Sequence, residues 1–147
     1  MNLPSTPEGE ELWQLLTSLA SDAAKLAYAP YSNYPVGAAA LVHDGRVVTG
    51  ANVENASYGL TLCAECSLVS ALIMSGGGSL AAFCCVDAAG QVIMPCGRCR
   101  QLLFEHGGPE LLVLTPVGER TMATVLPMAW GPEDLATMNQ VVGPDEP

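Results

Sequence analysis

Two short cysteine-bearing stretches constrain this chain more than any other feature of its sequence. They span residues 61–66 and 94–101, and each places thiols where we expect a helix to begin. A soft metal that favours tetrahedral geometry, such as zinc, takes thiolate ligands, and a catalytic zinc takes three protein ligands and keeps one position open. Cys63, Cys96 and Cys99 can supply these three ligands, which makes them the candidate ligands of one zinc ion.

A carboxylate lies inside the first of these stretches. Glu65 follows Cys63 by two positions, so it would lie beside the open position of such a metal. A carboxylate there can take up and return protons, which is general acid–base catalysis. The alternative interpretation of Glu65 is a solvated residue in the first turn of a helix.

The cysteines also allow two other interpretations. Cys63 with Cys66, and Cys96 with Cys99, form two Cys-x-x-Cys pairs, a pattern typical of a closed structural zinc in an interaction module. The 29 residues between the pairs exceed the roughly 15–20 usual in that pattern, and each pair lies in a long predicted helix. A redox-active pair is the second alternative, but the surroundings do not resemble a thioredoxin active site.

Composition and charge narrow the classes of partner. The chain has 147 residues, half of them hydrophobic, which favours a single globular domain over residues 1–147 with a frayed tail from about residue 140. Five basic residues against fifteen acidic ones give a net charge of −10. Such a surface repels phosphate backbones, so we expect a neutral small molecule as substrate rather than a nucleic acid polymer.

The redox environment follows from the absence of targeting signals. The first residues lack a basic region followed by an apolar run, and no apolar stretch approaches the length that spans a membrane. We therefore expect a cytoplasmic protein without a membrane partner. Its six cysteines would then stay reduced and serve in metal binding or burial rather than in disulfides.

Hydrophobic periodicity and turn residues predict alternating helices and strands. A helix should begin at a capping box near Ser5 and Glu8 and end before Pro30. A hairpin should turn at Asp44-Gly45. The expected elements are helices at 5–27, 62–75, 96–106 and 132–139 and strands at 36–42, 46–50, 80–87 and 111–115, with 122–127 ambiguous between the two. This order favours an α/β fold with a mixed sheet.

Three motifs together resemble a known family. Asn52-Val53-Glu54, Cys63-Ala64-Glu65 and the run Pro95-Cys96-Gly97-Arg98-Cys99 are similar to the motifs of the zinc-dependent cytidine deaminases, in the small class that acts on free nucleosides. The resemblance extends from about Ala27 to Leu135. It implies a single three-layer domain, with a mixed five-stranded sheet and helices on both faces. It also implies one zinc per chain and a homotetramer with shared active sites.

The resemblance implies hydrolytic deamination of cytidine and deoxycytidine in pyrimidine salvage. Zinc activates a water that attacks C4 of the cytosine, while Glu65 carries the proton to N3 and then to the departing amine. Asn52 and Glu54 are expected to hold a ribose hydroxyl. The remaining substrate-binding residues implied by the resemblance are Tyr34, Ala64, Tyr58 and Trp130, of which Tyr58 and Trp130 reach a neighbouring subunit.

The sequence departs from many of these relatives at one position. They carry an arginine directly after Cys-Ala-Glu, where it can donate to the zinc thiolates, and this chain has Cys66 there. Three thiolates and one Zn²⁺ sum to −1, so a nearby positive charge matters. Arg98 and Arg100 are both near the ligands in sequence, and we predict that Arg100 compensates the thiolate charge.

The last alternative concerns the substrate. An enzyme of the same fold could act on a cytosine-bearing antibiotic, and competition between cytidine, deoxycytidine and such a compound would distinguish them. Cys84 and Cys85 lie in a predicted strand and are expected to be buried as small hydrophobic residues. His43 and His106 are expected at the surface, because neither has ligand spacing to the cysteines.

Overall fold

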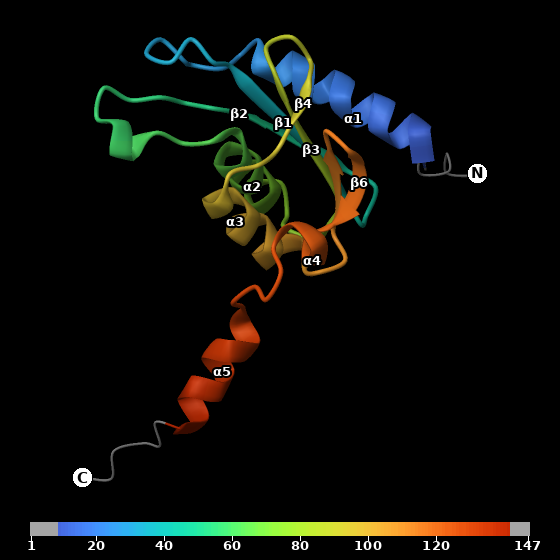
Figure 1. Cartoon of the computed structure of the whole chain (residues 1–147), viewed down its shortest axis with the longest axis vertical. Coiled ribbons are helices and arrows are strands. Elements are labelled where there is room, and N and C mark those ends of the chain that lie inside the picture. Colours follow the sequence, from blue (N-terminus) through green and yellow to red (C-terminus); the bar gives the residue numbers. More distant parts are fainter. Residues whose placement is uncertain (1–8, 142–147) are drawn as a thin grey trace.

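The computed structural model describes residues 9–141 and shows a mixed sheet between two layers of helix (Figure 1). The predicted capping box at Ser5 and Glu8 and most of the expected tail lie outside the described residues. The sheet has six strands, with a main path in the order β2-β1-β3-β5-β6 and a short β4 that pairs with β3. The three-layer α/β fold is thus as predicted, with six strands instead of five.

Helix α1 (Gly9–Ala24) covers one face of the sheet (Figure 1). Leu12, Leu16 and Ala20 recur at helical spacing, are buried, and pack in one apolar cluster with alternate residues of the central strands. The helix ends three residues before the predicted Ala27. Its end is set by a tertiary contact, because the Tyr28 N–H donates to Asn52 O at 3.0 Å and draws the chain into a bridge beside Val53.

The predicted hairpin is confirmed. Strands β1 (Val36–Val42) and β2 (Val47–Ala51) pair antiparallel. Gly45 in the turn has φ +92°, a left-handed conformation that glycine adopts without steric cost.

Strand β3 (Leu80–Asp87) is central and separates the two apolar layers. It pairs antiparallel with β1 and parallel with β5 (Leu112–Thr115), which is why the sheet is mixed. Cys84 is buried on the α1 side and Cys85 on the side of α2 and α3, so both are fully buried as predicted.

Two short strands were not predicted, and the segment that was ambiguous between strand and helix is helical. Strand β4 (Val92–Ile93) has two residues, and β6 (Gly118–Thr121) is mostly exposed and polar, so neither has the apolar alternation that marks a strand in sequence. The ambiguous segment forms a single helical turn, α4 (Met122–Val125), which buries Met122 in the core. The last helix, α5 (Pro132–Val141), forms where predicted.

Helices α2 (Ala64–Met74) and α3 (Gly97–Gly107) cover the opposite face of the sheet (Figure 1). Gly50 of β2 permits a very close approach to α2, because a Cβ there would collide with backbone atoms of Ala64 and Leu68. This contact presses the first turn of α2 onto the sheet. It therefore fixes where the preceding residue, Cys63, lies.

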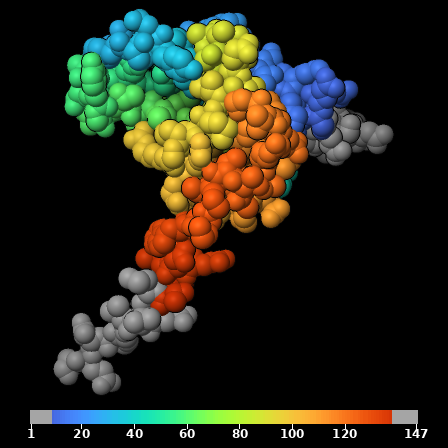
Figure 2. Space-filling view, in the orientation of Figure 1, coloured from blue at the N-terminus to red at the C-terminus, as the bar shows by residue number. Residues whose placement is uncertain are grey.

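Helix α5 projects from the rounded body of the molecule (Figures 1 and 2). Leu135 on α5 is half exposed, and Met128 and Trp130 in the segment before it are also exposed. Within residues 9–141, no helix has the length and apolar character needed to cross a lipid bilayer.

Candidate active site

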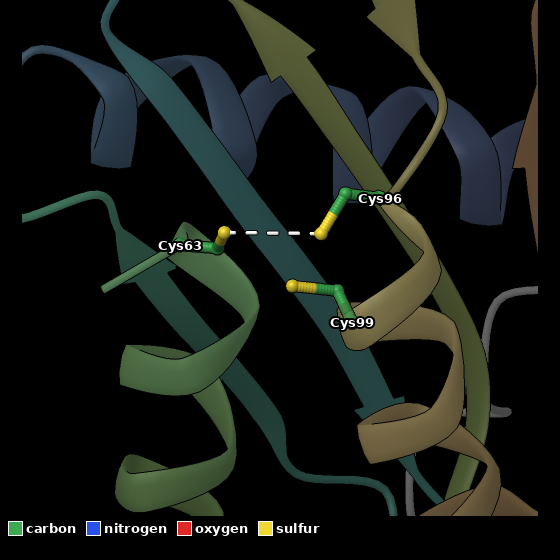
Figure 3. Close-up of side chains that lie close together, drawn as sticks. All are labelled: Cys63, Cys96 and Cys99. Atoms are coloured by element: carbon green, nitrogen blue, oxygen red, sulfur yellow. Dashed lines mark hydrogen bonds between the residues drawn. The ribbon is translucent and has the colours of Figure 1, made fainter. Parts of the chain in front are cut away.

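The three predicted ligands converge at the first turns of α2 and α3. Cys63 and Cys96 are the N-cap residues of the two helices, and Cys99 lies in the first turn of α3. Their sulfur atoms all lie within 4.8 Å of one another, and Cys63 Sγ is 4.0 Å from Cys96 Sγ. Figure 3 shows the three side chains pointing toward a common centre from the two helices.

This spacing suits a tetrahedral zinc site. A Zn–S bond is about 2.3 Å, so sulfur ligands at the corners of a tetrahedron lie about 3.8 Å apart. Three thiols at this separation leave the fourth corner open, as in a catalytic zinc site. Among the described residues, Cys66 is not part of the cluster, so the geometry favours a three-cysteine centre over the closed four-cysteine alternative.

The electrostatic environment of the three thiols also favours a bound metal ion. Burial and the neighbouring Cys96 and Glu65 raise the pKa of Cys63, and burial and Glu65 raise the pKa of Cys99. Burial also opposes ionisation of Cys96, but backbone N–H groups and the adjacent thiols outweigh it and lower its pKa. Three thiolates this close together need a bound cation, which is the role of Zn²⁺. The free N–H groups of two helix ends, each equivalent to about +0.5 charge, add to its effect.

The guanidinium at the thiols belongs to Arg98, not to Arg100 as predicted. Arg98 Nη2 lies 3.7 Å from Cys63 Sγ and 3.6 Å from Cys66 Sγ. Arg100 instead donates to backbone oxygens, from Nε to Pro95 O at 2.9 Å and from Nη1 to Val125 O at 3.1 Å. The reason is helical geometry, since two residues separated by one position project from different sides of α3.

Glu65 lies where the sequence placed it, beside the thiol cluster. It is in the first turn of α2 and only 4% exposed. With Cys63, Cys96 and Ala64 it lines a pocket of about 170 Å³. A buried carboxylate that faces both the ligands and a pocket is placed for proton transfer, and its burial contradicts the interpretation of a solvated helix residue.

Asn52 is buried and engaged at both ends of its amide. Its Oδ1 accepts from Val36 N at 2.9 Å, and its Nδ2 donates to Tyr34 O at 3.0 Å. It also lines the same pocket as Glu65. Asn52 therefore fixes the segment that carries Tyr34 while it faces the cavity.

Glu54 binds the preceding part of the same loop. Its carboxylate accepts from the backbone N–H groups of Tyr31 and Ser32, at 2.9 and 3.2 Å, and from the Ser32 hydroxyl. The Ser32 hydrogen bond is the main cause that lowers the pKa of Glu54. Glu54 is thus an ionised acceptor at neutral pH.

A second pocket of about 290 Å³ adjoins the first through Thr61. Tyr31 and Tyr58 line it and pack edge to face, with ring centroids 6.1 Å apart. This contact joins the loop before β1 to the loop after β2, and Figure 2 shows the two segments side by side at one end of the molecule. Ligand pockets typically span about 300–1,000 Å³, so the two pockets together suit a small two-part ligand.

Two predicted aromatics stand apart from these pockets. Among the described residues that line them, neither Tyr34 nor Trp130 is found. The Tyr34 side chain is half exposed. Trp130 is 58% exposed, and its backbone oxygen accepts a hydrogen bond from Gln101 Nε2 of α3 at 2.8 Å.

Sequence reasoning missed two neighbours of the site. Ser32 donates a hydrogen bond to Glu54. In the sequence, serine and asparagine shortly after a proline indicate only a turn. Cys85 was predicted only as a buried residue, yet burial and the adjacent Glu65 carboxylate raise the pKa of its thiol. No sequence signal identifies that neighbour, because β3 and α2 meet only in the folded chain.

Comparison with known sequences agrees with this geometry. Residues 11–115 match the family described as the cytidine and deoxycytidylate deaminase zinc-binding region. A cytidine deaminase of Mycobacterium tuberculosis is 62% identical over 123 residues, covering 84% of this chain and 92% of the relative. A cytidine deaminase of Halalkalibacterium halodurans is 39% identical over 127 residues, covering 83% and 96%.

Crystal structures of cytidine deaminases are similar to this chain in fold. The crystal structure of cytidine deaminase from Mycobacterium leprae superposes with a TM-score of 0.78 at 62% identity, covering 79% of this chain and 98% of that one. The corresponding structure from Mycobacterium tuberculosis gives a TM-score of 0.81 at 60% identity, covering 84% and 99%.

Proposed function

This chain belongs to the zinc-dependent cytidine deaminase family, and on that premise we propose that it hydrolyses the C4 amine of free cytosine nucleosides, giving uridine from cytidine and deoxyuridine from deoxycytidine. The observation that carries this proposal is the convergence of Cys63, Cys96 and Cys99 on one point, with the Glu65 carboxylate buried beside it. Recycling of free pyrimidine nucleosides is the process that such a reaction serves.

The chain's own residues divide the chemistry between them. Zinc bound by Cys63, Cys96 and Cys99 would supply a water acidic enough to ionise near neutral pH and a positive charge at the reacting carbon. Glu65 would take one proton of that water and deliver it to N3 of the base. It would then take the remaining proton from the oxygen added at C4 and give it to the amine, which leaves as ammonia as the C4–N bond breaks and the C4=O bond forms. Its burial at 4% exposure keeps bulk water from competing for the proton.

Recognition of the nucleoside rests on the two adjoining pockets. The 170 Å³ pocket contains Ala64 and Glu65 and takes the base, while the 290 Å³ pocket presents Glu54 to the sugar. Asn52 lies in the wall of the base pocket, and Thr61 lines both pockets. A net charge of −10 does not oppose a neutral nucleoside.

Completion of the site by neighbouring subunits is part of the proposal. Tyr58, Trp130 and Met128 are 76%, 58% and 99% exposed in the single chain, and large exposed apolar residues mark contact surfaces. We propose a homotetramer in which Tyr58 and Trp130 enter a neighbour's site and Tyr34 closes the base pocket. Residues 1–147 act in it as one domain, in the cytoplasm, where a reducing environment keeps thiols reduced.

Zinc-loaded protein should convert cytidine and deoxycytidine to the corresponding uracil nucleosides. The measurement is loss of cytosine absorbance with the two substrates, followed by competition against a cytosine-bearing antibiotic. Turnover of the antibiotic alone would reassign the substrate. No turnover of any of the three at full zinc content would contradict the proposed function.

Arg98→Ala should weaken zinc binding several-fold, because it removes the guanidinium beside Cys63 Sγ and leaves the negative charge of the centre less compensated. Competition with a chromogenic chelator would measure this affinity. Arg98→Lys should recover part of the loss, since it restores the charge without the planar fork.

Arg100→Ala is the matched control for the Arg98 variant. It should lower Tm, because Arg100 joins Pro95 to Val125, but it should weaken zinc binding less than Arg98→Ala does. An arginine moved to the position after Glu65, in the double variant Cys66→Arg/Arg98→Ala, should restore affinity. Wild-type zinc affinity in Arg98→Ala would show that the contact carries no charge compensation.

A further inference from the structure

The Glu54 carboxylate is already heavily engaged before any ligand arrives. Its Oε2 accepts from two backbone N–H groups, those of Tyr31 and Ser32, at 2.9 and 3.2 Å. Its Oε1 accepts from the Ser32 hydroxyl. Residues 31 and 32 therefore supply three donors to one side chain.

The Glu54 carboxylate has one acceptor site left for a ligand. An ionised carboxylate offers about four lone-pair sites, two on each oxygen. Three of those on Glu54 are occupied, so one is left, and it lies on Oε1, the oxygen shared with Ser32. Because Tyr31, Ser32 and Glu54 line the same 290 Å³ pocket, this last site is the one available to a ligand there.

The direction of the Ser32 hydroxyl is itself determined. Ser32 Oγ accepts from Tyr34 N at 3.0 Å, so the O–H hydrogen points away from that N–H and toward Glu54 Oε1. The hydroxyl is therefore a fixed donor rather than a free rotor. Removing it would release one carboxylate oxygen and leave the other held by the two backbone N–H groups.

We propose that Ser32 is a positioning residue for sugar recognition: it occupies one acceptor site of Glu54 Oε1 and so directs the single remaining site at a ribose hydroxyl in the pocket. This inference rests on the proposed function, because it requires a nucleoside as ligand. The hydrogen bond from Ser32 also lowers the pKa of Glu54. The ligand group that fits must donate, so a hydroxyl is accepted and a hydrogen atom in its place is not.

A double-mutant cycle tests the inference, with cytidine, 2′-deoxycytidine and 3′-deoxycytidine as probes. Glu54→Ala first identifies the contacted hydroxyl, since the analogue that lacks it should lose least in kcat/KM. Ser32→Ala should then raise KM for cytidine about 3–10-fold, the size expected for a weakened hydrogen bond to a charged group. Its kcat should stay within about twofold, as for an interaction made equally in ground and transition states.

Two comparisons separate positioning from a general structural role. On the analogue identified by Glu54→Ala, Ser32→Ala should change KM little. In the Glu54→Ala background, Ser32→Ala should cause no further rise in KM, because Ser32 acts only through Glu54. Ser32→Thr keeps the hydroxyl and should restore wild-type KM, and Ser70→Ala, an exposed serine on α2, is the control for serine removal.

Failure of the Ser32 role and failure of the proposed function would give different results. Equal losses on all three nucleosides, or additive losses in the double variant, would overturn the role of Ser32 while wild-type turnover still upheld the proposed function. A wild-type protein with full zinc and no nucleoside turnover would overturn both.

Discussion

Glu65→Gln should retain zinc and fold yet lose at least about 10²–10⁴ in kcat, the range expected for one general acid–base group. Glutamine keeps the size of the side chain and much of its hydrogen bonding, but it cannot accept and return a proton. Glu65 would serve successive proton transfers, so the upper end of the range is expected. Substrate binding should persist, because the loss lies in the transition state rather than in uniform binding.

Metal content, kcat, KM and Tm measured on one purified sample would check this expectation. Glu105→Gln also removes one negative charge, but at an exposed position on α3 that is not part of the thiol cluster. It should leave kcat unchanged. Nearly normal turnover by a zinc-replete Glu65→Gln variant would refute the proton-transfer role. Loss of zinc would instead assign Glu65 a part in holding the metal.

Substitution of any one ligand, as in Cys63→Ala, Cys96→Ala or Cys99→Ala, should abolish zinc binding and activity together. Two thiols no longer complete the three-ligand set. Stability should fall as well, since binding and folding are coupled. If free zinc exceeds Kd a thousandfold, its loss costs about 4 kcal/mol, or about 10–15 °C in Tm.

Cys66→Ala is the matched control, because Cys66 lies in the same turn of α2 but outside the thiol cluster. It should keep one zinc per chain by elemental analysis and lose only its contact with Arg98. Complete zinc loss in Cys66→Ala, equal to that of Cys63→Ala, would establish a four-cysteine centre.

One half of the metal centre was predictable from sequence because it depends on local spacing. A thiol immediately before a helix and another in its first turn lie close together, so Cys96 and Cys99 could be paired without a structure. The same spacing relates Cys63 to Cys66, so the choice of Cys63 over Cys66 rested on the resemblance to the deaminase family. The hairpin and the central strand were predictable for a similar reason. Their apolar runs end at clear turn residues, and β1 and β3 form with the predicted bounds.

Contacts between distant segments were not predictable in this way. Arg98 and Arg100 are equivalent by sequence distance, and only the crossing of α2 and α3 brings Arg98 to Cys63. The proximity of Cys85 to Glu65 depends on how β3 packs against α2. Strand β6 forms because β5 offers it a free edge, which its own polar residues do not reveal.

The hydrogen bonds of Asn52 and Glu54 to the segment 31–36 bear on how readily this protein could be re-engineered. Changing either side chain to accept a new sugar would also release the backbone that carries Tyr31 or Tyr34. A library that varies only positions 52 and 54 would therefore yield mostly loosened loops. Variants with altered sugar preference should emerge when residues 31–36 are randomised together with that pair, so that a new acceptor and its supporting donors are selected at once.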